Sequence, residues 1–362
     1  MIVKVRSFLE KIRPYKPGKP IEEVIRELGL KGDVIKLASN ENPLGVSKLA
    51  LAAMRKAIRE MQLYPDDNCY YFRKKLAEYH KLELNNFFVG NGSVEILPTI
   101  TTAYLGPGNS AFVSKGAFIW YKIAVNISDG ELIEVPLKDY RHNLDEILKA
   151  IKNNTKLIFI DNPINPTGTA VYKDELDAFM EKVPDNVLVV IDEAYKEYIA
   201  DPNYPDSMKY FKEGKNVIIL RTFSKIYGLA GIRLGYGISK EVVIASLMKL
   251  RVSFNVNRIA QYAGIAALDD EEHIKRGIEV NEEGKQFLYD AYKKLGLFYL
   301  QTYANFIFVD FPRDSKLIFE ELQRRGIITR TIKEYDFPNA LRITIGTEKQ
   351  NRRLIRELKK IL

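Results

Sequence analysis

One lysine with an unusual set of neighbours is the residue best placed to do chemistry in this chain. Lys225 follows an apolar run typical of a buried strand, and the segment around it reads RTFSKIYGLAGIRLGY (residues 221–236). Burying a lysine at the end of a core strand is costly unless its amine is paired or modified. Condensation with an aldehyde is one such modification, and the hydroxyls of Thr222 and Ser224 with the guanidinium of Arg233 could bind a phosphate on the same molecule.

Two further polar motifs follow strand-like apolar runs. The first, DEAY (residues 192–195), comes after VLVVI, a continuous β-branched run that is typical of a parallel strand covered on both faces. A carboxylate at the carboxyl end of such a strand faces the ligand crevice of an open α/β sheet, where it could pair with a protonated ring nitrogen. The second, NPINPTG (residues 162–168), follows LIFI and predicts a rigid loop with few backbone donors.

A glycine turn supplies a candidate anion site. The segment GNGSVE (residues 90–95) follows FFV, so a strand, a glycine-rich turn and a helix start come together. Free N–H groups and the helix dipole at such a turn favour an anion. A dinucleotide site would explain the glycine pair equally well, but the full G-x-G-x-x-G fingerprint does not follow this strand, which argues against that alternative.

Taken in order along the chain, these motifs resemble those of the histidinol-phosphate aminotransferases, a family of fold-type I enzymes that use pyridoxal phosphate (PLP). The resemblance covers roughly residues 36 to 350. It implies that Lys225 binds PLP covalently and then moves the proton of the substrate carbon. It also implies that Asp192 holds the pyridine nitrogen, and that Tyr195 and Asn165 bond the 3-oxygen of the ring.

The same resemblance implies the remaining cofactor contacts. The phosphate is expected to be bound by Gly92, Ser93, Val94, Thr222, Ser224 and Arg233. Phe118 is expected to stack on the pyridine ring, since a flat apolar face suits a planar cofactor. Tyr64 is expected to reach across a dimer interface to the phosphate of the partner's PLP, so the implied functional unit is a homodimer with shared active sites. Val94 stands where relatives carry Asp or Asn, which leaves only an amide contact there.

Two arginines in the last third of the chain are the candidates for substrate binding. Arg330, in GIITR, and Arg342, in LRITIG, both occupy strand-like positions from which a guanidinium could grip an anion. Surface ion pairs would explain them as well. By the resemblance, Arg342 takes the carboxylate of the amino-acid donor, and Arg330 with Tyr15 grips the phosphate of histidinol phosphate. Asn42 and Asn257 also match family positions near the substrate.

The function implied by the resemblance is PLP-dependent transamination of L-histidinol phosphate with 2-oxoglutarate in histidine biosynthesis. Aromatic amino-acid aminotransferases share the YPD and FNVN segments of this branch, so an aromatic amino acid stays open as the main substrate. Threonine-phosphate decarboxylases use the same lysine but usually differ in the YGLA loop, which disfavours them. Effector-sensing regulators of this fold carry a DNA-binding module, for which we expect no room at either end of the chain.

Composition excludes several other classes of protein. The chain has 362 residues and a net charge of +8, but no basic run with interleaved aromatics that would indicate nucleic-acid binding. A single cysteine, Cys69, rules out an internal disulfide and fits a reducing compartment. The three histidines, His80, His142 and His273, lack metal spacing and look like surface or boundary residues, so no metal site is expected. No apolar stretch is long enough to span a membrane, and a soluble cytoplasmic enzyme is predicted.

The elements that must position these residues form an α/β pattern. Residues 1–34 read as an N-terminal arm, residues 35–255 as a large PLP-binding domain and residues 256–362 as a smaller α+β domain. In the large domain, short apolar strands alternate with amphipathic helices, which predicts a mostly parallel sheet between helices. Strands are predicted at 87–90, 110–114, 131–135, 156–161, 187–192, 216–221, 306–310, 327–330 and 341–345. Helices are predicted at 69–81, 94–104, 143–152, 240–252, 258–268, 271–294 and from 348 onward.

Overall fold

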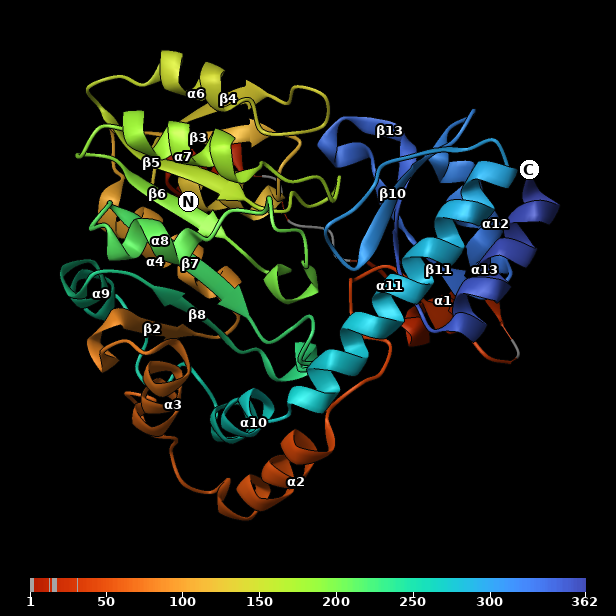
Figure 1. The fold of residues 1–362 in the computed structure, drawn as a ribbon, viewed down its shortest axis with the longest axis horizontal. Helices are drawn as coiled ribbons and strands as arrows, with labels where there is room; N and C mark the ends of the chain where they lie inside the picture. The colour runs from red at the N-terminus through yellow and green to blue at the C-terminus, as the bar shows by residue number, and fades with distance from the viewer. Residues whose placement is uncertain (1–2, 13, 15–17, 31) are drawn as a thin grey trace.

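A seven-stranded sheet forms the centre of the molecule. The structure is a computed structural model that describes residues 3–12, 14, 18–30 and 32–362. The strands of the central sheet lie in the order β2-β8-β7-β6-β5-β3-β4 (Figure 1). Their bounds are β2 Phe87–Gly90, β3 Ser110–Lys115, β4 Glu131–Pro136, β5 Thr155–Asp161, β6 Leu188–Asp192, β7 Val217–Thr222 and β8 Gly235–Ile238. Strands β7, β6, β5, β3 and β4 pair in parallel, and β8 runs antiparallel to both β7 and β2. The predicted mostly parallel sheet is confirmed.

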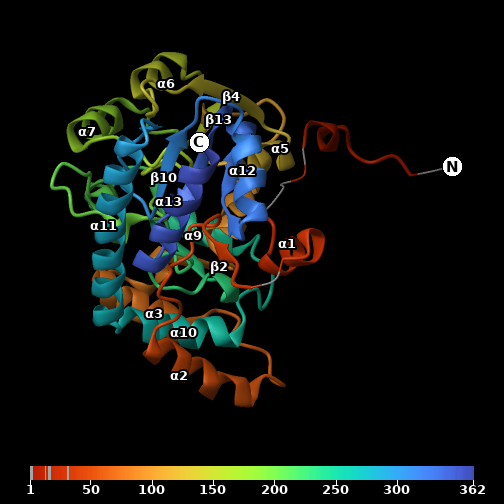
Figure 2. The same cartoon turned by 90° about the vertical axis from the view of Figure 1, so that its right-hand side faces the viewer.

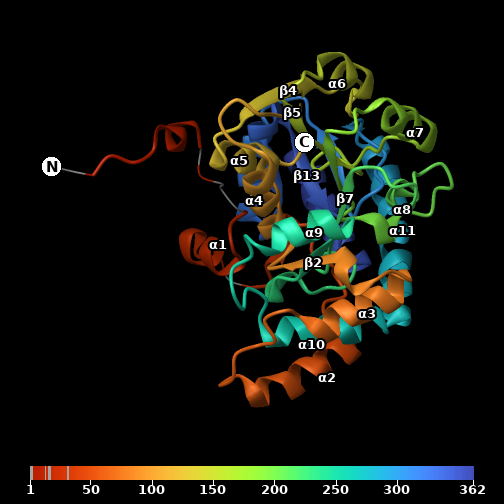
Figure 3. The same cartoon turned by 90° about the vertical axis from the view of Figure 1, so that its left-hand side faces the viewer.

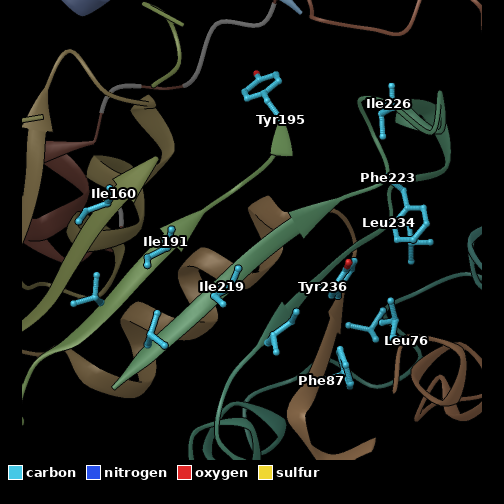
Figure 4. Close-up of a cluster of buried hydrophobic side chains, with 14 of the residues drawn as sticks. Leu76, Phe87, Ile160, Ile191, Tyr195, Ile219, Phe223, Ile226, Leu234 and Tyr236 are labelled. Carbon is cyan, nitrogen blue, oxygen red and sulfur yellow. The ribbon is translucent and has the colours of Figure 1, made fainter. Parts of the chain in front are cut away.

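The sheet carries a hydrophobic core on each face because its central strands are apolar on both sides. Ile160, Ile191 and Ile219 point to one face, where Figure 4 shows them in a row beside Tyr236. Alternate residues such as Val190 point to the other face. The first face is covered by α2 Lys48–Ala57, α3 Tyr70–His80, α6 Leu144–Ala150, α7 Lys173–Lys182, α8 Ser207–Lys212 and α10 Arg258–Leu268. The second is covered by α4 Ser93–Tyr104, α5 Ile119–Ile127 and α9 Glu241–Met248. This two-sided burial explains the uninterrupted apolar runs in the sequence.

A smaller α+β domain holds its own sheet, in the order β12-β13-β10-β9 (Figure 1). Its elements are α11 Glu271–Lys294, β9 Phe298–Tyr299, β10 Phe306–Asp310, α12 Ser315–Arg324, β11 Ile327–Ile328, β12 Arg330–Ile332, β13 Phe337–Thr344 and α13 Glu348–Ile361. The strand predicted at 327–330 is in fact two short strands that belong to different sheets.

The start of the chain joins this smaller domain. Strand β1 (Ile35–Lys36) pairs in parallel with β11, and Val24 of α1 (Ile21–Leu28) packs with Ala38 and Ile328. Ahead of it, η1 (Ser7–Lys11) lies outward of the main body in Figures 2 and 3.

Helix α10 packs against α2 and α3 of the large domain. Its Ala260 and Ala263 belong to the core of that domain.

Strand β8 has no counterpart among the predicted elements because its sequence, Gly-Tyr-Gly-Ile, lacks an apolar run. A Cβ at Gly235 would collide with the backbone N of Ser93 and lie 2.7 Å from the backbone C of Gly92. The glycine is thus required for the close approach between β8 and the glycine turn that opens α4. No helix in the described ranges is long and apolar enough to cross a membrane.

Candidate active site

A pocket of about 260 Å³ lies where the carboxyl ends of the parallel strands face the smaller domain. An open α/β sheet binds its ligands at this edge. The pocket brings together twelve of the predicted residues: Ser93, Val94, Phe118, Asn165, Asp192, Tyr195, Thr222, Ser224, Lys225, Arg233, Arg330 and Arg342. They come from the large domain and from β12 and β13, so the site exists only where the two domains meet.

Lys225 is the nucleophile candidate in this pocket. Burial first, and then repulsion from Arg342, lower the pKa of Lys225 to about 7 from 10.5. Its Nζ donates to the carbonyl of Ser39 at 3.1 Å. Within the described part of the chain, no carboxylate lies within ion-pair distance of this amine. A large share of Lys225 is therefore uncharged at neutral pH and can attack a carbonyl carbon.

Asp192 is a buried carboxylate with no ion-pair partner among the described residues. Its Oδ2 accepts a hydrogen bond from the Tyr121 hydroxyl at 3.0 Å, and its Oδ1 accepts one from the Ala194 N–H at 3.1 Å. Burial, followed by the nearby Asp161, raises the pKa of Asp192 to about 7. A cationic ring nitrogen at this position would reverse that shift, because an opposite charge stabilises the ionised carboxyl. Asp192 is therefore suited to a ligand that brings a positive charge to it.

Tyr195 and Asn165 present polar groups beside Asp192. The Tyr195 hydroxyl accepts a hydrogen bond from Nδ2 of Asn40 at 2.9 Å, and burial raises the pKa of Tyr195 to about 12. Asn165 accepts a bond from Nη1 of Arg342 at 2.5 Å through its Oδ1. Tyr195 therefore keeps its proton at neutral pH and can donate it to a ligand oxygen.

The glycine turn and β7 form a seat for an anion. A Cβ at Gly92, whose φ is 80°, would collide with the guanidinium of Arg233, so only glycine leaves that guanidinium its place. Nη1 of Arg233 donates to the Ser224 Oγ at 3.2 Å, and the Ser224 N–H donates to the Thr222 Oγ1 at 3.1 Å. Helix α4 begins at Ser93, which adds the positive end of its dipole. The donor set fits a phosphate.

The two substrate arginines differ in their surroundings. Arg342 is buried, and its Nη2 donates to the carbonyl of Ala38 at 2.6 Å, while its Nε has no hydrogen-bond partner among the described residues. Arg330 pairs with Glu334 at 2.5 Å, as the surface-ion-pair alternative expects, but it lines the pocket as well. Both arginines thus line the pocket in which a ligand anion would bind.

Among the described residues, four that were predicted for the site do not line the pocket: Gly92, Asn42, Asn257 and Tyr64. Asn42 donates from Nδ2 to the carbonyl of Ile226 at 2.6 Å and fastens the loop after Lys225, rather than lining the pocket. Asn257 caps α10 by accepting from the Ala260 N–H at 2.8 Å. Tyr64 is 78% exposed and stacks on Phe254, with 4.6 Å between ring centroids. Tyr15 lies outside the described residues.

Polar residues around Asp192 escape the sequence-based prediction. Asn40, Tyr121 and Asp161 all line the pocket. Only Asp161 carries a readable signal, because it ends β5 as Asp192 ends β6.

The expectation that all three histidines lie at surface or boundary positions is wrong for His142. That side chain is buried between the Ser114 hydroxyl, 2.6 Å from its Nδ1, and Asp161. Groups of His, Cys, Asp and Glu that could hold a metal are absent from the described part of the chain.

Comparison with known proteins identifies the family of this chain. The family model for aminotransferase class I and II matches residues 32–358. A histidinol-phosphate aminotransferase from Moorella thermoacetica is 49% identical over 362 residues, covering 100% of this chain and 94% of the relative. Another from Caldicellulosiruptor saccharolyticus is 45% identical over 357 residues, covering 99% of each chain.

Solved structures agree with this assignment. The crystal structure of histidinol-phosphate aminotransferase from Sinorhizobium meliloti in complex with pyridoxal-5'-phosphate has a TM-score of 0.91 and 26% identity, covering 100% of this chain and 98% of that one. The histidinol-phosphate aminotransferase from Clostridium acetobutylicum has a TM-score of 0.84 and 23% identity, covering 91% and 99%. The fold is that of the fold-type I aminotransferases, as predicted. The chain belongs to the histidinol-phosphate aminotransferase family.

Proposed function

We propose that this protein catalyses the transamination of L-histidinol phosphate with 2-oxoglutarate, giving imidazole acetol phosphate and glutamate, in histidine biosynthesis. One observation carries the proposal: the buried amine of Lys225, whose pKa is lowered to about 7, shares a pocket with the buried carboxylate of Asp192 and with an anion seat at Arg233. Relatives that are 42–49% identical over nearly the whole chain are histidinol-phosphate aminotransferases.

PLP fits this donor set. Asp192 would hold its ring nitrogen, Tyr195 and Asn165 its ring oxygen, and Phe118 one face of the ring. The phosphate would be held by Gly92, Ser93, Val94, Thr222, Ser224 and Arg233. When bound, the cofactor supplies an electron sink that stabilises negative charge on the substrate carbon.

The residues of the chain supply the proton transfers and the orientation. Lys225 would hold the cofactor through its Nζ. Once the substrate amine displaces it, the freed amine would serve as the base and then the acid that moves the proton of the substrate carbon. Asp192 stays ionised once it faces a cation, and so keeps the opposing nitrogen protonated. The anion seat at Arg233 fixes one end of the bound molecule, which holds the reacting atoms close to Nζ.

The arginines distinguish the substrates. Arg342 would take the carboxylate of glutamate or 2-oxoglutarate, and Arg330, with Tyr15, the phosphate of histidinol phosphate. Aromatic amino acids are the second candidate, because the exposed stack of Tyr64 and Phe254 lies within the YPD and FNVN segments shared with their aminotransferases.

The test is the visible absorbance of the purified, PLP-loaded protein before and after L-histidinol phosphate is added. We expect the band of lysine-bound cofactor to convert to the amine form, and 2-oxoglutarate to restore it. A band that ignores histidinol phosphate but responds to L-tyrosine or L-phenylalanine would move the assignment to aromatic substrates. Absence of any band would overturn PLP dependence.

The proposal includes a homodimer with shared sites. Four large apolar side chains between α2 and α3 are exposed: Ile58, Met61, Leu63 and Tyr64. Several large exposed apolar side chains in one short segment favour association. We also propose a cytoplasmic location, since Cys69 is buried and unpaired, which suits a reducing compartment.

A further inference from the structure

A second buried carboxylate stands beside Asp192. Asp161 ends β5 and is the register partner of Asp192 at the end of β6, so the two side chains point to the same face of the sheet. Asp161 is 3% exposed and lines the pocket. The proposed chemistry assigns no role to this carboxylate. Its presence calls for an explanation, because burying two carboxylates side by side is unfavourable.

One oxygen of Asp161 joins two separate segments of the site. Its Oδ2 accepts the N–H of Asn165 at 2.9 Å and the N–H of Phe118 at 3.4 Å. Asn165 lies in the loop after β5, and Phe118 is the N-cap of α5. In the proposed function these are the residues that meet the oxygen and the face of the cofactor ring, so one carboxylate oxygen sets the spacing between them.

His142 contacts both the backbone carbonyl and the carboxylate of Asp161. Its Nε2 lies 2.9 Å from the backbone carbonyl of Asp161, where it forms a hydrogen bond, and 3.2 Å from Oδ1. Its Nδ1 lies 2.6 Å from the Ser114 Oγ on β3. The imidazole side chain is entirely buried, so it cannot turn without breaking both contacts. The backbone of Asp161 is therefore tied to the imidazole, which also lies against Oδ1, an oxygen with no hydrogen-bond partner among the described residues.

We propose that Asp161, braced by His142, is a positioning residue that ties Phe118 to Asn165 and so fixes the orientation of the bound cofactor ring. The inference rests on the proposed function, because it assigns a further residue to the same site. The competing explanation is that Asp161 stabilises the fold alone. The two differ in whether the geometry of the bound cofactor changes when the tie is removed.

The experiment compares Asp161→Ala, Asp161→Asn and His142→Gln with the wild-type protein, in three measurements. These are the PLP dissociation constant of the cofactor-free protein, the visible circular dichroism per bound PLP, and the Tm of the cofactor-free protein. Ser110→Ala is the matched control, because Ser110 is a buried polar residue on β3 whose hydroxyl bonds Thr155, away from the pocket. It should lower the Tm and leave both PLP measurements unchanged.

For Asp161→Ala we expect PLP affinity to fall about tenfold, as for the loss of buried hydrogen bonds, with a clear loss of visible dichroism. Asp161→Asn keeps an oxygen for both amides and should bind within about threefold of wild type. His142→Gln should fall between them, and it decides the matter if Asp161→Ala does not fold.

Two results would overturn the inference. One is a lower Tm with unchanged PLP affinity and dichroism in Asp161→Ala, or in His142→Gln if the former is unfolded. The other is an Asp161→Asn variant as impaired as Asp161→Ala, since charge rather than the amide tie would then matter. A wild-type protein that does not bind PLP would instead refute the proposed function, and this inference with it.

Discussion

Arg330 and Arg342 lie directly opposite each other on the adjacent antiparallel strands β12 and β13. Side chains at such paired positions share one face of the sheet. Both line the pocket that also contains Lys225, so the smaller domain presents two neighbouring guanidinium groups to a ligand bound there. Two neighbouring cations repel each other, and the arrangement favours ligands that carry an anionic group for each, or one strongly charged group.

Replacing Arg330 by Ala should therefore weaken histidinol phosphate much more than a substrate without a phosphate. Loss of a charge-assisted contact costs about 2 kcal/mol, which corresponds to roughly a 30-fold lower kcat/KM for histidinol phosphate. L-Tyrosine turnover in the same variant should change by less than about threefold. Arg324→Ala on α12, an exposed arginine paired with Glu321, is the control. Equal losses for both substrates would remove Arg330 from phosphate binding.

Replacing Lys225 by Ala should abolish turnover. The variant loses both the nucleophile and the proton carrier, and the rate should fall by about a thousandfold or more. Steady-state assays with histidinol phosphate and 2-oxoglutarate measure this directly, with circular dichroism to confirm that the variant is folded. Near-normal activity would rule out the mechanism as a whole.

The stability of the cofactor-free protein should depend on pH through Lys225. The folded pKa is about 7 and the reference value is 10.5, so the unfolded chain binds more protons between these limits. Stability contributed by this residue therefore rises with pH across that window. Lys225→Met removes the contribution, and its advantage over wild type should shrink from about 3 kcal/mol or more at pH 7 to a small value near pH 10.

Urea unfolding of the cofactor-free proteins at pH 7 and pH 9.5 measures that difference. Lys293→Met, at an exposed position on α11, should show the same difference from wild type at both pH values. A difference that stays constant with pH for Lys225→Met as well would show that the amine is not held uncharged by its surroundings.

Adding one methyl group at Gly235 should disable the anion seat. The Cβ would collide with the Ser93 backbone at the start of α4, so the glycine turn must move. Overpacking of this kind costs about 1–3 kcal/mol, and we expect PLP to bind at least roughly tenfold more weakly. At Gly106 a Cβ meets nothing within 4 Å, which makes Gly106→Ala the matched control. Titration of each cofactor-free variant with PLP distinguishes them, and equal affinities would place the phosphate elsewhere.

Hybrid dimers test whether sites are shared. A dimer of one Lys225→Ala chain and one Tyr64→Ala chain would place both defects in one site and leave the other intact if Tyr64 serves the partner's site. Such a hybrid, isolated by two affinity tags, should recover about half of the wild-type activity. Activity no higher than that of the Tyr64→Ala homodimer would show that each chain uses its own Tyr64.

The sequence predicts those site residues that sit at the ends of buried strands. Asp192 and Lys225 follow long β-branched runs, and the register of a parallel sheet brings such ends to one edge without further information. The contacts among Asp161, His142 and Ser114 could not be predicted in this way. They join three separate segments of the chain through side chains, and no sequence periodicity encodes such contacts. Strand β8 is also hidden, since its glycines serve close packing rather than β-propensity.

The pairing of β1 with β11 has a consequence for how the protein is made. Residues 37–40 bond to Ile328 and Thr344 near the end of the chain, and also supply the Ser39 carbonyl to Lys225. Residues 37–40 leave the ribosome early, but the pocket cannot close until Ile328 and Thr344 have also been synthesised. A nascent chain that stops short of β13 would hold its lysine and its sheet but no complete site, so cofactor capture should follow the synthesis of β13.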